Sequence, residues 1–167
     1  MLFAAVGLAT ALLWLAWVVW VPLLPTNLYV PLLDLGKITG YTWSSAIRFL
    51  AIVLGLYVLY AISYRLVGQG QAAAASVFGF AATFCLALIA AYPATAVDVF
   101  AYIAHGRILA QHHGNPFLAP ASAYPEDPIL PYLAFPDEPS QYGPLWVLLG
   151  GALSSVAGGH LLTEMLL

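Results

Sequence analysis

Three long apolar runs constrain the fold of this 167-residue chain more than any other feature. They cover about residues 1–21, 46–64 and 72–91, and Arg48 is the one charged side chain among them. A helix needs about 20 mostly apolar residues to cross the hydrocarbon core of a bilayer. Charged residues make up 7% of the chain, far below the share of about 25% in soluble domains. We therefore predict an all-α fold, a polytopic transmembrane helix bundle.

The two ends of the chain need separate consideration. Residues 1–21 could be a signal peptide, but they lack a basic start and are too long, so we expect a retained span. A fourth span is expected over residues 145–160. The chain then ends in a further apolar stretch that resembles the start of another helix. We therefore expect residues 1–167 to be the N-terminal part of a single, larger membrane domain.

The charges between the apolar runs predict how the chain is oriented. The linker of residues 65–71 carries one arginine and no acid, so the positive-inside rule places it in the cytoplasm. The N-terminus is then also cytoplasmic, and the loops 22–45 and 92–143 are extracytoplasmic. Lys37 and Arg48 lie on the outer side and argue against this orientation. We predict a multi-pass protein of the cell membrane, in contact with membrane lipid.

Residues 92–143 form a polar loop that holds five of the seven acids and three of the four histidines. Chemistry is expected in such a loop because the hydrocarbon around membrane spans excludes ionised groups. Thr95 and Asp98 have the spacing of a capping box, and the sequence Gly114-Asn-Pro stops a helix, so a juxtamembrane helix is expected over 96–113. The net charge of −3 argues against nucleic acid as a partner.

Two charged residues of this helix each have a structural and a functional interpretation. Asp98 could cap the helix and interact with its dipole, or it could be a general base that activates a hydroxyl. Arg107 could be an interfacial cation, or its guanidinium could bind a phosphate. Asp98, Tyr102 and His105 share one helix face, whereas Arg107 lies almost opposite Asp98.

The other polar groups of the loop have simpler interpretations. His112 and His113 diverge by about 100° on a helix, which argues against one metal ion bound by both. Tyr142 lies in a turn before the fourth span and could anchor the interface. Four acids in Pro-rich sequence are expected to be solvated: Glu126, Asp127, Asp137 and Glu138.

Four short motifs follow one another in this loop. They are Asp98-Val-Phe-Ala-Tyr102, Gly106-Arg107, Gly114-Asn115-Pro116-Phe117 and Tyr142-Gly143-Pro144-Leu145. In this order they resemble the first large external loop of GT-C-fold integral membrane glycosyltransferases. The closest likeness is to bacterial polyprenol-phosphate-mannose-dependent mannosyltransferases. The flanking spans agree with these proteins only in hydrophobicity.

The resemblance implies a hexosyltransferase that moves a sugar, mannose in the closest relatives, from a polyprenyl-phosphate-linked donor to a glycan or lipid acceptor outside the cytoplasmic membrane. Asp98 would be its catalytic base, and Arg107 would face the donor phosphate. The candidate substrate-binding residues are Tyr102, His105, Asn115 and Tyr142. Many relatives have paired acids where this chain has Asp98 alone, so we expect no metal and no cofactor, with a divalent ion as the alternative. Those relatives have more spans, so this chain by itself is expected to be inactive.

Two other classes of function are open at this point. A transporter module would place ionisable residues near the bilayer midplane, and the apolar runs have almost none. A non-catalytic membrane scaffold would need Asp98 and Arg107 only for capping and interfacial contacts. An enzyme, in contrast, is expected to bring Asp98 and Arg107 to one open cavity.

Overall fold

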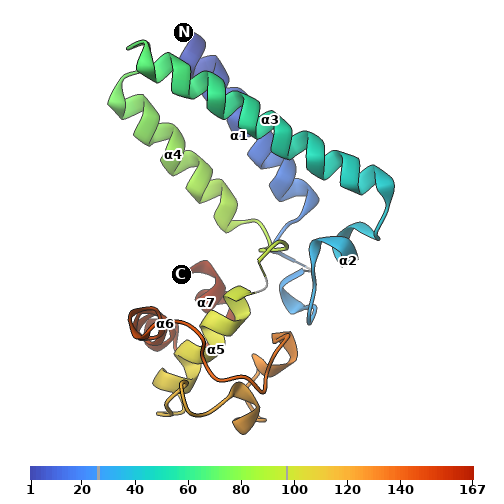
Figure 1. The fold of residues 1–167 in the computed structure, drawn as a ribbon, viewed down its shortest axis with the longest axis vertical. Coiled ribbons are helices and arrows are strands. Elements are labelled where there is room, and N and C mark those ends of the chain that lie inside the picture. The colour runs from blue at the N-terminus through green and yellow to red at the C-terminus, as the bar shows by residue number, and fades with distance from the viewer. Residues whose placement is uncertain (26, 97) are drawn as a thin grey trace. The chain divides into compact units, whose positions relative to one another are not determined.

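The computed structural model describes residues 1–25, 27–96 and 98–167. Within these ranges the chain is helical and has no strand, so the predicted all-α fold class is confirmed. Its contacts divide it into two compact units (Figure 1). The first comprises Met1–Asn27 and Leu35–Tyr92, and the second comprises Leu28–Asp34 and Pro93–Leu167. The membership of both in one membrane domain stays a prediction.

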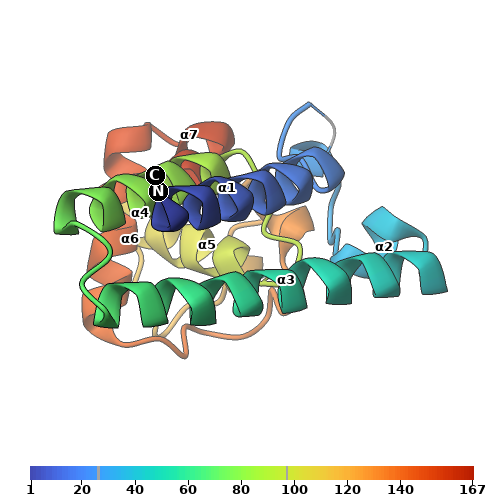
Figure 2. The ribbon, with the colours of Figure 1, turned by 90° about the horizontal axis from the view of Figure 1, so that it is seen from above.

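The first unit is built on three apolar helices, α1 (Leu2–Trp20), α3 (Trp43–Gly68) and α4 (Ala74–Ile89). α1 contacts both α3 and α4, and Figure 2 shows α1 running alongside α3. A small core at one end joins Phe3 of α1 to Leu66 of α3. Most large apolar side chains of these helices are exposed, as is expected of surfaces that face lipid. The connection from α1 to α3 contains η1 (Asn27–Tyr29) and α2 (Leu35–Thr39).

In the part of the chain that the structure describes, two helices, α1 and α3, are long and apolar enough to cross a membrane, judged by length and composition. They correspond to the predicted spans 1–21 and 46–64. The predicted spans 72–91 and 145–160 are apolar helices of 16 and 14 residues. These are shorter than the roughly 20 residues of a simple span. A four-span topology and its orientation therefore stay predictions.

The second unit contains α5 (Asp98–Ala110), α6 (Pro144–Ala157) and α7 (Leu161–Leu166). α5 packs along α6, and both contact α7. The segment between α5 and α6 is mostly irregular, with single turns at η2 (Ala121–Ala123) and η3 (Leu130–Tyr132). Its many prolines disfavour longer helices because proline lacks the backbone N–H donor.

α5 is shorter than the predicted helix 96–113. It ends at Ala110 because His113 has a left-handed backbone (φ 52°) and the N–H of Gly114 donates to the carbonyl of Ile108. The helix also begins three residues after Thr95, so the predicted capping position is wrong. The residue just before α5, at position 97, lies outside the described residues.

The contact between α5 and α6 depends on glycines. A Cβ placed on Gly106 would lie 2.5 Å from the carbonyl oxygen of Gly150, which is closer than real Cβ atoms come. A Cβ on Gly151 would lie 2.8 Å from Cδ2 of Leu109. The glycine of the Gly106-Arg107 motif therefore lets two helix backbones approach each other, as small residues do at membrane helix interfaces.

Gly106→Ala should lower the unfolding free energy of the protein by about 1–3 kcal/mol, because the added methyl meets rigid backbone. Thermal unfolding in detergent would measure the change. Gly79→Ala in α4 is the matched control, because nothing lies within 4 Å of its Cβ position. Alanine there should be neutral or stabilising by about 0.5–1 kcal/mol. Equal unfolding temperatures for the two variants would contradict the close helix contact.

Candidate active site

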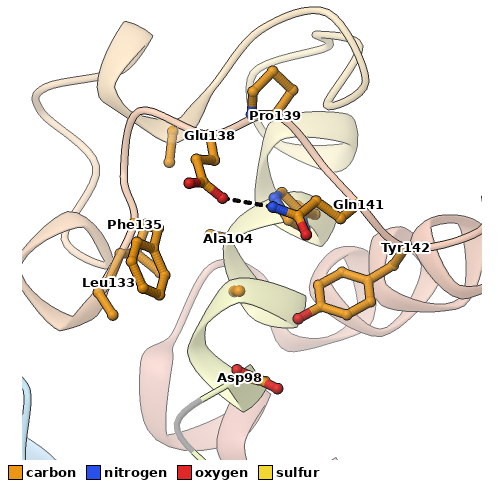
Figure 3. Close-up of a pocket in the computed structure, with 12 residues that line it drawn as sticks. Asp98, Ala104, Leu133, Phe135, Glu138, Pro139, Gln141 and Tyr142 are labelled. Atoms are coloured by element: carbon orange, nitrogen blue, oxygen red, sulfur yellow. Dashed lines mark hydrogen bonds between the residues drawn. The ribbon is translucent and has the colours of Figure 1, made fainter.

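Asp98 begins α5 in the second unit, and its side chain is exposed. It lines a cavity of about 390 Å³ (Figure 3). The other polar side chains around this cavity are His105, Glu138, Gln141 and Tyr142. A carboxylate in the first turn of a helix is stabilised by the helix dipole and stays available to solvent and substrate. An interaction of Asp98 with the helix dipole and its catalytic interpretation are therefore compatible.

Tyr142 belongs to an aromatic cluster at one side of the cavity. Its ring lies 4.6 Å from that of Tyr102, edge to face, and Tyr102 lies 5.2 Å from Trp146 in α6. Burial and the nearby negative charge of Asp98 raise the pKa of the Tyr142 phenol. Tyr142 therefore keeps its proton at neutral pH and presents a hydroxyl to the cavity. Tyr102 supports this ring and does not itself line the cavity.

His105 lines the same cavity and is buried, with 7% of its surface exposed. Burial lowers its pKa from the usual 6.5, so the imidazole is neutral at pH 7. Its Nδ1 atom is buried and has no hydrogen-bond partner among the residues that the structure describes. Leaving a buried polar atom without a partner costs about 1–3 kcal/mol, and such an atom calls for a functional or structural explanation.

Glu138 and Gln141 form the remaining polar part of the lining. The side-chain amide of Gln141 donates a 2.5 Å hydrogen bond to Oε2 of Glu138 (Figure 3). The sequence predicted Glu138 to be a solvated loop acid. It is exposed, but it lines the cavity together with Asp98. No spacing rule connects positions in an irregular loop, so sequence reasoning did not single out Glu138 or Gln141.

Arg107 lies in a different environment, a buried ion-pair network. Its Nε donates to both carboxylate oxygens of Asp127, at 2.8 and 3.1 Å. Its Nη1 donates to the carbonyl of Gly159 at 2.7 Å and to Glu164 at 3.0 Å. Ser154 of α6 donates to the second oxygen of Glu164 at 2.6 Å. This network joins α5, the irregular segment, α6 and α7.

The expectation that Asp98 and Arg107 border one cavity is wrong. Arg107 is not part of the cavity lining, and only 6% of its surface is exposed. The two residues have different surroundings, Asp98 at the cavity and Arg107 in the ion-pair network, which agrees with their spacing on the helix. Asp127 is also not a solvated loop acid, because it is buried against Arg107. A direct contact between Arg107 and a donor phosphate stays an untested prediction.

The charges of this network stabilise one another. Burial alone would raise the pKa of the Asp127 carboxyl, but hydrogen bonds from the Ile129 N–H, His112 and Arg107 outweigh it and hold that pKa below 3.8. Burial alone would lower the pKa of Arg107, and its bonds to Asp127 and Glu164 raise it instead. Both groups are therefore charged near neutral pH. Nε2 of His112 lies 2.6 Å from Oδ2 of Asp127, within hydrogen-bond distance, and the His112 ring stacks on that of Tyr124.

Asn115 lies outside the cavity, in a turn. Its side-chain oxygen accepts a 3.0 Å hydrogen bond from the N–H of Phe117, and its carbonyl accepts from Leu118 and Ala119. These bonds give Asn115 a structural role, and its role toward a substrate stays a prediction. No group of three or more potential metal ligands occurs among the residues that the structure describes.

These features define a class of protein, an all-α protein with long apolar helices and a cavity lined by carboxylates. Residues 4–167 match the family described as alpha-(1->6)-mannopyranosyltransferase, N-terminal domain. The chain therefore belongs to this family, and the predicted resemblance to the N-terminal part of a mannosyltransferase is confirmed. Membership of this family supports glycosyltransferase activity for the protein. No curated protein and no solved structure matches the chain.

Proposed function

We propose that this chain carries the catalytic base of a membrane α-(1→6)-mannosyltransferase. The donor in this proposal is mannose linked to a polyprenyl phosphate, and the acceptor is a 6-hydroxyl of a mannose-containing glycan or lipid at the extracytoplasmic face. The observation that carries the proposal is the exposed carboxylate of Asp98 at the wall of a cavity, in a chain of this family. A hydroxyl that enters the cavity could reach this carboxylate.

The reaction is a single displacement at the anomeric carbon. Asp98 takes the proton of the acceptor hydroxyl as the bond from its oxygen to C1 of mannose forms. The bond from C1 to the phosphate oxygen breaks, and the polyprenyl phosphate leaves with the electron pair. The positive charge that develops on the sugar is stabilised by a nearby carboxylate, as in glycoside hydrolysis. One displacement inverts the anomeric centre, so an α product requires a β-linked donor.

Arg107 has a supporting role in this proposal. It is the only lysine or arginine of the second unit, and its bonds to Asp127 and Glu164 occupy it. We therefore assign it to holding α5 in place and not to the leaving phosphate. The rigid attachment of α5 fixes the direction in which Asp98 meets the acceptor, and such positioning accounts for a large part of enzymatic rate enhancement.

A transfer assay on the full-length protein in membranes tests the proposal. Radiolabelled polyprenyl-phosphate mannose is supplied together with an α-mannoside or with its 6-deoxy analogue. The expected result is an α-(1→6)-linked product with the mannoside and none with the analogue, which lacks the attacking oxygen. Product formation only from a nucleotide-linked donor, or equal labelling of both acceptors, would refute the proposed donor or acceptor position.

A further inference from the structure

The cavity that Asp98 lines has a second polar end. Figure 3 shows Glu138 and Gln141 at the upper end of the cavity and Asp98 at the lower end. Phe135, which is 72% exposed, and Tyr142 lie at its sides. The catalytic step described above uses only Asp98. The other polar groups therefore need an explanation of their own.

We propose that this cavity is the acceptor subsite, and that Glu138 and Gln141 bind hydroxyl groups of the acceptor sugar. The proposal rests on the proposed function and adds the place and the residues of acceptor recognition. Glu138 and Gln141 are positioning residues here, because they hold the acceptor while Asp98 removes its proton. The donor phosphate lies outside this cavity.

The charge of the lining selects the ligand class. Asp98 and Glu138 both line the cavity, and none of the described residues that line it is a lysine or arginine. Two carboxylates without a cation repel a phosphate, whereas they accept hydrogen bonds from neutral hydroxyls. A neutral sugar therefore fits this cavity better than the charged part of the donor does.

The arrangement of Glu138 and Gln141 suits a sugar. The carboxylate offers acceptors only, and the amide offers both donors and an acceptor, so adjacent hydroxyls of one ring can bind both. Without a ligand the two side chains bond to each other, which keeps their polar atoms paired. Phe135, at one side of the cavity, provides an exposed aromatic surface for the apolar face of the ring. A few placed polar groups among apolar ones are typical of small-molecule sites.

His105 adds a buried imidazole to the polar groups around the cavity. It lines the cavity, is more than nine-tenths buried, and its Nδ1 has no partner among the described residues. A hydroxyl group can both donate and accept a hydrogen bond, so it can pair with this nitrogen in either tautomer.

Calorimetric titration of an α-mannoside into the purified full-length protein tests the inference without requiring catalysis. The wild type should bind, and Glu138→Gln and Gln141→Ala should each weaken binding about tenfold. Asp137→Asn is the matched control, because this neighbouring acid is exposed and does not line the cavity. It should bind like the wild type. In the transfer assay Glu138→Gln should raise the KM for the acceptor and leave the KM for the donor unchanged.

The two hypotheses fail separately. Binding of the mannoside without any transfer would refute the proposed function and keep the subsite. Transfer by the wild type with unchanged acceptor affinity in both Glu138→Gln and Gln141→Ala would refute the subsite alone. The subsite would also be refuted if the wild type did not bind the mannoside. It would be refuted as well if the cavity bound a divalent ion and Glu138→Gln abolished that binding. Both side chains are exposed, so their variants should fold normally.

Discussion

Asp98→Asn is expected to reduce mannosyl transfer by about 10²- to 10⁴-fold, the usual contribution of a general base. Asparagine has the same shape as aspartate and can still accept hydrogen bonds, but it cannot take the proton of the acceptor hydroxyl. Because Asp98 is exposed, membrane insertion and the unfolding temperature should change little. The transfer assay with polyprenyl-phosphate mannose measures the loss, and thermal unfolding in detergent checks the fold.

Asp137→Asn is the control for this prediction. It makes the same chemical change in the same loop, away from the cavity lining, and should transfer at the wild-type rate. Mannoside binding should survive in Asp98→Asn, since the acceptor is held mainly by other residues in our proposal. Wild-type transfer by Asp98→Asn would remove Asp98 from the mechanism.

Arg107→Met should destabilise the protein by about 3–5 kcal/mol, the cost of breaking a buried ion pair by removing one partner. Methionine has a similar length and no charge. It would leave the carboxylates of Asp127 and Glu164 buried without their cation. The expected result is a large fall in the unfolding temperature, measured in detergent, with little folded protein recovered from membranes.

A combined variant separates the charge effect from the packing effect. Arg107→Met with Asp127→Asn and Glu164→Gln removes all three charges together, and replacing a whole buried ion pair is often neutral. This variant should recover much of the lost stability. If Arg107→Met alone unfolds at the wild-type temperature, the network does not hold α5 as proposed.

Acid should act on the same network through Asp127. Its pKa in the folded protein lies below the usual 3.8, so its ionised form stabilises the fold above that pH. As the pH falls below about 4, the Asp127 carboxyl of the unfolded state binds a proton while that of the folded state is still ionised. The stability that this carboxylate provides is therefore lost progressively until the pH is below its pKa in the folded protein. Unfolding temperatures measured from pH 6 downward should show this decline, and the decline should be smaller in Asp127→Asn.

Local features of the sequence predicted the long apolar helices and the position of Asp98 near the start of another helix. The apolar runs predicted α1 and α3, because crossing a bilayer demands length and hydrophobicity that the composition itself displays. The prolines and glycines of the loop predicted where α5 stops to within a few residues. Asp98 was singled out because a carboxylate at the start of a helix beside apolar sequence can serve as a base as well as interact with the helix dipole. It lies at a cavity wall, and its catalytic role stays a prediction.

The surroundings of Arg107 and Glu138 were decided only by the tertiary structure. The partners of Arg107 lie 20 and 57 residues further along the chain, and helix spacing rules connect only residues three or four apart. Glu138 looked like any solvated acid, since an irregular, proline-rich segment has no periodicity from which its direction can be predicted. The sequence by itself determined where the long apolar helices lie and that Asp98 is in the first turn of a further helix. The path of the irregular segment across α5 determined which acid neutralises the arginine and which acid lines the cavity, because that path depends on contacts between distant residues.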